Sequence, residues 1–196
     1  MGYRFIAGLD EAGRGPLAGP VVAATVIVLD YKKIKNIKKI NDSKKLSKKQ
    51  REYLYKIITS HPEIKWGVGI VSEKIIDKIN ILEATKLAMV KSFKKIKVDY
   101  LLLDGNFTLR QAQGKKYISQ KSIIRGDAKV MSIAMASIIA KVTRDRMMQK
   151  YHKKYPKYGF FQHKGYPTKA HFASLAKFGP CKIHRMTFCP EKLSTP

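Results

Sequence analysis

The sequence predicts an α/β fold in which helices flank a mixed sheet. Three observations indicate this: apolar β-branched runs alternate with segments of helical periodicity, the first two apolar runs follow one another directly, and helical segments separate the later ones. The chain has 196 residues, 44% of them hydrophobic, which is enough to bury one sizeable core. We expect a single domain over residues 1–196, with a core over about residues 1–150 and a C-terminal helical segment over about residues 151–196.

Three strands are expected in the first half of the chain. Residues 3–7 have strand character, residues 18–29 form a long β-branched run typical of a buried strand, and residues 65–71 resemble a further strand. The lysine-rich residues 32–39 are expected to form a solvated loop or edge.

Capping residues mark two helix starts. Ser47 and Gln50 form a capping box ahead of a helix that should end at residues 61–62, and Asn80 with Glu83 forms a similar start for a second helix. The predicted apolar face of the first helix consists of Tyr53, Leu54, Ile57 and Ile58.

The second half of the chain predicts two strands and two helices. Residues 98–103 form a short apolar strand that ends at Asp104, and residues 117–124 are compatible with another strand. A long helix without Gly or Pro is expected over residues 128–151, and a short one over residues 168–178.

Charge and composition restrict the partners. The chain has 40 Lys and Arg against 14 Asp and Glu, a formal net charge of +26, so a polyanion is the natural partner. No apolar run approaches the ~20 residues needed to span a bilayer, and no charged-then-apolar leader precedes the first strand, so we expect a cytoplasmic monomer with no membrane partner. Cys181, His184 and Cys189 match only part of a zinc knuckle, so structural zinc is not expected.

An acid pair and a glycine-rich turn stand together near the start of the chain. Asp10 and Glu11 close an apolar strand and directly precede Gly13-Arg14-Gly15. The glycines permit backbone conformations in which successive amides face one anion, and Arg14 adds a planar donor fork. Because bare carboxylates would repel a phosphate, a divalent cation is expected between them. The arrangement predicts metal-assisted cleavage or transfer at a phosphodiester.

Two further acids fit the same site. Asp104 closes a strand after a helical crossover, and functional groups gather at the carboxyl ends of strands in open α/β sheets, where Asp10 and Glu11 would also emerge. Asp127 begins the long helix, where it would serve as an N-cap, although a carboxylate there can also face a metal. Spacing alone is compatible with a four-carboxylate metal cluster and leaves the role of Asp127 open.

Several segments together carry a family resemblance. The run Asp10-Glu11-Ala12-Gly13-Arg14-Gly15-Pro16-Leu17-Ala18-Gly19-Pro20-Val21-Val22-Ala23-Ala24 is followed in order by Asp42-Ser43-Lys44-Lys45-Leu46-Ser47, Asn80-Ile81-Leu82-Glu83-Ala84-Thr85, Leu103-Asp104-Gly105-Asn106, Gly126-Asp127-Ala128-Lys129, Ala136-Ser137-Ile138-Ile139-Ala140-Lys141-Val142-Thr143-Arg144-Asp145, His163-Lys164-Gly165-Tyr166 and His184-Arg185. In this order and over nearly the whole chain, the segments resemble the bacterial ribonuclease HII family, the type 2 ribonucleases H.

The resemblance implies a ribonuclease H-like fold with a C-terminal helical extension. It implies endonucleolytic cleavage of the RNA strand in RNA/DNA hybrids and incision 5′ to ribonucleotides embedded in duplex DNA, giving a 5′-phosphate and a 3′-hydroxyl. By motif match, the catalytic and metal-binding carboxylates are Asp10, Glu11, Asp104 and Asp127. Two divalent ions, Mg²⁺ or Mn²⁺, about 4 Å apart would hold the scissile phosphate, one helping to deprotonate the attacking water and the other stabilising the leaving 3′ oxygen.

Substrate selectivity is also implied by the resemblance. Gly13, Arg14 and Gly15 would read the 2′-hydroxyl, and Tyr166 would stack on the adjoining deoxyribose. Without the resemblance, the simpler interpretation of Tyr166 is a surface aromatic in a turn. Residues 191–196 lack the Gln and paired aromatics of a sliding-clamp peptide, so no such partner is expected.

Other charged residues have simpler interpretations. Asp145 is expected to pair with a neighbouring Arg along its helix, and His163 and His184 to form hydrogen bonds or face a phosphate rather than bind a metal. Four lysines either form a solvated face or contact the nucleic-acid backbone, namely Lys44, Lys45, Lys48 and Lys49.

Two other classes of protein stay open. A basic RNA-binding protein without enzymatic activity would explain the charge but has no need for carboxylates at three separated strand or helix ends. A junction resolvase or an integrase-type nuclease would share the acid cluster but would not require a 2′-hydroxyl. Metal dependence and an all-DNA substrate discriminate between these classes.

Overall fold

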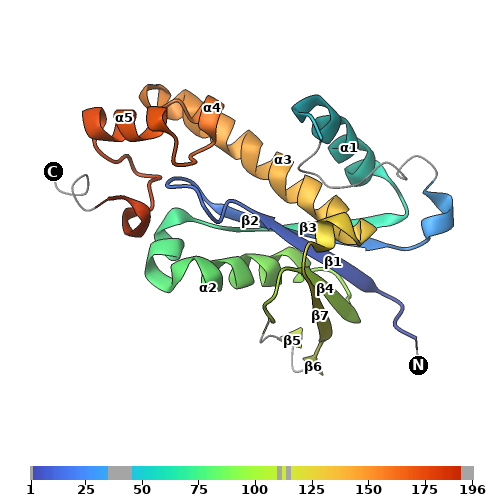
Figure 1. The fold of residues 1–196 in the computed structure, drawn as a ribbon. Helices are drawn as coiled ribbons and strands as arrows, with labels where there is room; N and C mark the ends of the chain where they lie inside the picture. Colours follow the sequence, from blue (N-terminus) through green and yellow to red (C-terminus); the bar gives the residue numbers. More distant parts are fainter. Residues whose placement is uncertain (1, 35–45, 110–111, 114–115, 191–196) are drawn as a thin grey trace.

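The structure is a computed structural model that describes residues 2–34, 46–109, 112–113 and 116–190. Five strands form one mixed sheet: β1 (Ile6–Ala12), β2 (Val21–Val28), β3 (Ile64–Val71), β4 (Tyr100–Asp104) and β7 (Ser119–Ile123). Their order is β3-β2-β1-β4-β7, in which β2 runs antiparallel to both of its neighbours, β1 and β3, and β4 runs parallel to both β1 and β7 (Figure 1). The predicted α/β class with a mixed sheet is therefore confirmed.

Helices cover both faces of this sheet. The helix α2 packs on one face, against β1, β2 and β3, whereas α3 packs on the other face against β1 and β2 and carries α1 beside it (Figure 1). In the described part of the chain, the helices are α1 (Lys48–Ser60), α2 (Glu73–Phe93), α3 (Met131–Lys154), α4 (Phe160–His163) and α5 (Lys169–Phe178).

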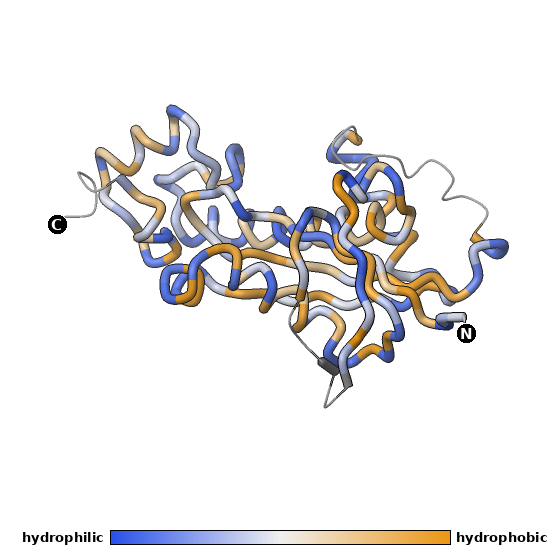
Figure 2. The backbone as a smooth tube through the Cα atoms, turned by 60° about the horizontal axis from the view of Figure 1, so that its bottom comes forward, coloured by the Kyte–Doolittle hydropathy of each residue, from blue (hydrophilic) through white to orange (hydrophobic). Residues whose placement is uncertain are grey.

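The strand β2 shows why its sequence is a continuous apolar run. Val21, Ala23 and Ile27 belong to the core under α2, whereas Ala24 and Val26 belong to the core under α1 and α3. Because side chains alternate along a strand, a strand covered on both faces favours apolar residues throughout, and the one polar residue of β2, Thr25, is hydrogen-bonded to Ser92. The hydropathy of the backbone tube follows this arrangement, with hydrophobic residues concentrated along the inner strands (Figure 2).

The helix α1 begins at the predicted capping box. Ser47 Oγ accepts from the Gln50 amide, and the Gln50 side chain accepts from the Ser47 amide at 2.8 Å. Leu54 and Ile58 are buried as expected, but Tyr53 is 65% exposed, so its predicted place on the buried face is wrong. Tyr55 instead packs against this core.

The helix α2 begins earlier than predicted and is kinked at the expected start. Asn80 has a left-handed φ of 64°, and its side-chain oxygen accepts from the amides of Leu82 and Glu83 at 2.9 and 3.1 Å. Asn80 therefore caps the second half of the helix, as predicted from Asn80 and Glu83, while residues 73–79 form an additional helical segment that the pattern did not indicate.

The remaining elements agree in outline with the expectation. The long helix is α3 and the short C-terminal one is α5, whose N-cap Thr168 accepts from His171 N. The short helix α4 and the two-residue strands β5 (Ala112–Gln113) and β6 (Lys116–Tyr117) were not predicted. The strands β4 and β7 are joined through the β5–β6 hairpin rather than by a helix, contrary to the expected pattern for late strands. Among the described residues, no helix is long and apolar enough to cross a membrane.

Candidate active site

Three aspartates meet at the carboxyl ends of the parallel strands. Leu9 of β1 lies opposite Leu103 of β4, so the next residues along the two strands, Asp10 and Asp104, are neighbours. Asp127 reaches the same place from a 3-10 turn over Gly126–Ala128 that follows β7. One carboxylate oxygen from each aspartate lies within 4.8 Å of the others. The sheet topology thus brings together acids that are far apart in the sequence.

Backbone amides fix two of these carboxylates. Glu11 N donates to Asp10 Oδ1 at 2.7 Å, and Gly126 N donates to Asp104 Oδ1 at 2.7 Å. Asp127 itself is not the N-cap of α3, because that helix begins after Val130, which offers no side-chain cap. The N-cap interpretation of Asp127 is therefore wrong, and its buried carboxylate belongs to the aspartate cluster.

Glu11 lies beside the cluster without converging on the same point. Its Oε1 accepts a long bond of 3.4 Å from Arg14, and its side chain is 11% exposed. In the described part of the chain, its other oxygen, Oε2, is buried without a hydrogen-bond partner. A carboxylate oxygen left in this position favours an additional ligand at the site.

Burial and mutual repulsion dominate the electrostatics of the site. Desolvation first, and then the charges of Glu11 and Asp104, raise the pKa of Asp10 well above its usual value, while a hydrogen bond from Ser137 opposes the shift. Desolvation also raises the pKa of Glu11, against the opposing effect of Arg14. A divalent cation would reverse this repulsion, and a set of carboxylate oxygens is the donor set that Mg²⁺ or Mn²⁺ prefers. The residues present therefore fit such an ion.

A cavity of about 320 Å³ opens in front of the acids. Its walls include Gly13, Arg14 and Gly15 and, beside Gly15, Tyr166, which is 40% exposed. The backbone of Gly13 has a φ of +98°, and a Cβ there would lie 2.1 Å from Arg144 Nε, so only glycine fits. A Cβ on Gly15 would meet only the Tyr166 ring at 3.9 Å, so packing within the protein does not require glycine at that position.

Three further residues line the cavity that the sequence did not single out for it. They are Arg51 from α1, and Ser137 and Lys141 from α3. Lys141 Nζ pairs with Asp145 at 2.9 Å, so the expected partner of Asp145, a neighbouring Arg, is wrong. The signal for Ser137 and Lys141 was their place in one of the segments that carry the family resemblance.

The predicted histidines lie away from the cavity lining, in the C-terminal segment. His163 Nε2 lies 2.7 Å from the Tyr158 carbonyl and its Nδ1 accepts from Gly165 N, whereas His184 Nδ1 accepts from Cys181 N. Both form hydrogen bonds, which is one of the two expected roles. Within the described residues, the only group of His, Cys, Asp and Glu that could hold a metal is the aspartate cluster, so Cys181 and its neighbours give no zinc site.

Of the four lysines considered above, the structure describes Lys48 and Lys49. Lys48 Nζ lies 5.3 Å from the centre of the Phe161 ring, and Lys164 approaches the same ring at 4.7 Å. Lys44 and Lys45 lie outside the described residues, as does the tail over residues 191–196.

Comparison with known proteins agrees with this geometry. The sequence profile of the family described as Ribonuclease HII matches residues 7–191. A ribonuclease HII of Chlamydia muridarum is 52% identical over 196 residues, covering 99% of this chain and 86% of that protein, and one of Bacillus licheniformis is 52% identical over 193 residues, covering 97% and 72%. The crystal structure of ribonuclease H2 from Pyrococcus horikoshii OT3 has a TM-score of 0.76 at 30% identity and covers 97% of both chains, which confirms the expected ribonuclease H-like fold. The chain belongs to the ribonuclease HII family and is an endoribonuclease of the ribonuclease H type, acting on RNA paired with DNA.

Proposed function

We propose that this protein cleaves the RNA strand of RNA/DNA hybrids and incises 5′ to single ribonucleotides embedded in duplex DNA, leaving a 5′-phosphate and a 3′-hydroxyl. The observation that carries the proposal is the convergence of Asp10, Asp104 and Asp127 within 4.8 Å, beside a cavity whose lining includes Asp10, Asp104, Gly15 and Tyr166. Acids alone would support any metal-dependent nuclease. The turn and the tyrosine beside them are what favour a substrate with a ribose at the cleavage site.

Four carboxylates would hold the metal ions in this proposal: Asp10, Glu11, Asp104 and Asp127. Two divalent ions, Mg²⁺ or Mn²⁺, would supply an activated water and neutralise the charge that develops on the phosphate and the leaving oxygen. The chain's own contribution is orientation, because the Glu11 and Gly126 amides hold Asp10 and Asp104 in fixed positions.

Positive side chains would bring the phosphate to the acids. Three cationic residues line the same cavity as Asp10 and Asp104, namely Arg14, Arg51 and Lys141. They would neutralise backbone phosphates on either side of the scissile bond and so position it without carrying sequence information.

Ribose selectivity would come from the glycine-rich turn and from Tyr166, which lie beside each other in the cavity lining. Backbone groups of Gly13, Arg14 and Gly15 would bond the 2′-hydroxyl, and the Tyr166 ring would stack on the sugar of the next nucleotide. Packing within the protein does not require glycine at position 15, which supports this role, because a backbone without a side chain there allows a ligand to approach closely.

The rest of the proposal concerns how the chain acts. We place residues 1–196 in one catalytic domain, since the C-terminal segment bonds the turn through Leu17 N to Gly165 O and Gly19 N to Ile183 O, each at 2.8 Å. The enzyme would act as a cytoplasmic monomer on duplex nucleic acid, without a sliding-clamp peptide. The net charge of +26 supports the nucleic-acid partner.

The test is to separate cleavage from binding. Asp104→Asn should lower the cleavage rate of an RNA/DNA hybrid by at least about 10²-fold, because it removes metal charge. Its affinity for the same duplex in chelator should stay within about twofold of the wild type, because the basic surface is intact. Wild-type turnover by this variant at saturating Mg²⁺ would overturn the assignment.

Tyr166→Ala addresses the selectivity separately. It should slow cleavage at a junction between ribonucleotide and deoxyribonucleotide by about tenfold or more, and affect binding of all-DNA duplex much less, since one stacking contact contributes about 1–3 kcal/mol. Equal losses for both duplexes would contradict stacking on the sugar.

A further inference from the structure

Two arginines are the largest fully buried side chains in the described part of the chain. Arg144, on α3, is 1% exposed, and Arg185, in the C-terminal segment, is 0% exposed. Neither forms an ion pair with a carboxylate within the described residues. Burying a cation without a counter-charge is costly, so both guanidiniums must be satisfied in another way.

Backbone carbonyls satisfy them, and six of these bonds converge on one loop. Arg185 donates to the carbonyls of Gly13 at 2.6 Å, of Arg14 at 2.9 Å and of Gly19 at 2.8 and 2.9 Å. Arg144 donates to Pro20 O at 3.0 Å and Ala18 O at 3.1 Å. The loop over residues 13–20, which carries the candidate ribose-reading turn, is therefore held from the inside by two cations.

These bonds dictate where the amides of the turn point. In a trans peptide, the C=O and the following N–H point in opposite directions. Because Arg185 draws the carbonyls of Gly13 and Arg14 inward, the N–H groups of Arg14 and Gly15 must point away from it. Neither of these amides donates to an acceptor in the described protein, and both residues line the cavity.

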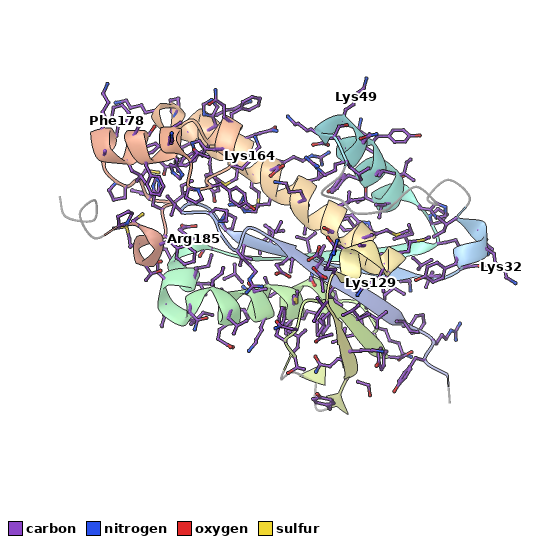
Figure 3. All side chains as sticks on the ribbon, viewed as in Figure 1. Lys32, Lys49, Lys129, Lys164, Phe178 and Arg185 are labelled. Carbon is purple, nitrogen blue, oxygen red and sulfur yellow. The ribbon has the colours of Figure 1, made fainter. Side chains whose placement is uncertain are left out.

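Arg144 also contacts the segment around Tyr166. Its third bond goes to Lys164 O at 3.0 Å, and its Cζ lies 5.8 Å from the centre of the Tyr166 ring. The same guanidinium thus bonds the loop before Val21 and the segment that carries Tyr166. Figure 3 labels Arg185 and Lys164 in the C-terminal part of the structure.

We propose that Arg185 is a positioning residue that aims the amides of Arg14 and Gly15 at the substrate ribose, and that Arg144 sets the distance between this turn and Tyr166. The inference rests on the proposed reading of the ribose by this turn. The electrostatics agree with a cation kept for its geometry, because burial first and then the charge of Arg144 lower the pKa of Arg185 to about 9, which leaves it charged at neutral pH.

Arg185→Lys tests the proposal, because it keeps the charge but loses the planar fork that reaches three carbonyls. Binding is measured in chelator for a DNA duplex with one ribonucleotide and for the same duplex in all-DNA form. The wild type should prefer the first duplex. In the variant, the ratio of the affinity for the ribonucleotide duplex to that for the all-DNA duplex should fall toward one. Its affinity for the all-DNA duplex should stay within about twofold of the wild-type value.

Arg146→Lys is the matched control, an Arg-to-Lys change on α3, the helix that carries Arg144. Arg146 pairs with Glu52 at 2.6 Å and stacks on Tyr55, so its replacement should leave the preference unchanged. If the wild type shows no preference, the proposed function fails. If the wild type discriminates and Arg185→Lys discriminates equally, only the role of Arg185 is overturned.

Hydrogen exchange on the wild-type protein tests the direction in which the Arg14 and Gly15 N–H groups point, even if Arg185→Lys does not fold. The amides of Arg14 and Gly15 should exchange rapidly in the free protein, and should be protected by the ribonucleotide duplex but not by the all-DNA duplex. Protection of both amides in the free protein would overturn the proposed geometry.

Discussion

Replacement of Asp10 by Asn should remove activity and yet stabilise the metal-free protein. The Asp10 carboxylate is buried, and desolvation and the charges of Glu11 and Asp104 raise its pKa well above the ordinary value. A carboxyl group whose pKa is higher in the folded than in the unfolded state opposes folding once the pH rises above the unfolded value of about 3.9. At neutral pH, Asn removes this cost.

The expected magnitudes follow from that reasoning. In chelator, Asp10→Asn should raise the free energy of unfolding by on the order of 1 kcal/mol, which corresponds to about 2–4 °C in melting temperature for a chain of this size. Mg²⁺ at ten times its Kd should stabilise the wild type by about 1.4 kcal/mol. The variant should gain less, because it lacks one ligand, so the metal should reduce or reverse the difference.

The assay is a pair of thermal melts for each protein, in chelator and in Mg²⁺, with hybrid cleavage measured on the same samples. Asp30→Asn is the control, because Asp30 caps a surface turn at Lys32 N and lies outside the site. It should gain no stability in chelator and should respond to Mg²⁺ like the wild type. A melting temperature for Asp10→Asn several degrees below wild type in chelator, or an equal response of both proteins to Mg²⁺, would refute the reasoning.

Three other predictions concern the turn, the buried histidines and the kink of α2. Gly15→Ala should have the melting temperature of the wild type but should cleave at an embedded ribonucleotide at least about tenfold more slowly. Gly13→Ala should melt at a lower temperature, because its Cβ would collide with Arg144. Equal melting temperatures of the two variants would contradict this. Burial lowers the pKa of His171 and His184 to about 4, so acid protonates these histidines in the unfolded chain before it does so in the folded one. The free energy of unfolding should therefore fall by on the order of 2 kcal/mol per histidine as the pH drops from about 6.5 to 4. In urea titrations, His184→Gln should show a smaller fall than the wild type. Asn80→Ala should lower the free energy of unfolding by about 1–2 kcal/mol in the same titrations, since alanine loses the cap and is strained at positive φ. Asn80→Gly should lower it clearly less, because glycine adopts positive φ without strain. Equal losses for the two variants would argue against the backbone strain.

Local signals in the sequence were sufficient for much of the fold. The capping box at Ser47 acts over four residues, and the nearly continuous apolar run of β2 reflects burial on both faces, so both can be recognised without knowing the partner elements. The missed elements are those with little local signal. The β5–β6 hairpin has two residues in each strand, and the first turns of α2 are separated from the rest by the backbone of Asn80.

The site could be predicted only for residues at the carboxyl ends of adjacent parallel strands, where functional groups gather in α/β sheets. Asp104 ends β4, and Asp10 lies in β1 one residue beyond the last pair between these parallel strands, so their proximity follows from topology. The position of Asp127 depends on the 3-10 turn before α3, which a capping preference does not reveal. Nothing in the sequence distinguishes Arg144 and Arg185 from solvated arginines, because their acceptors in the loop over residues 13–20 are more than a hundred residues away in the chain.

Cleavage of a labelled DNA duplex that carries one ribonucleotide tests the central claim most directly. It is measured with Mg²⁺, with Mn²⁺ and with chelator, beside an all-DNA duplex of the same sequence. The account predicts incision 5′ to the ribonucleotide that depends on the metal and does not occur in the all-DNA duplex. Cutting of both duplexes would contradict the selectivity assigned to the turn and Tyr166, and tight binding without cutting under any metal condition would contradict the enzymatic role of the aspartate cluster.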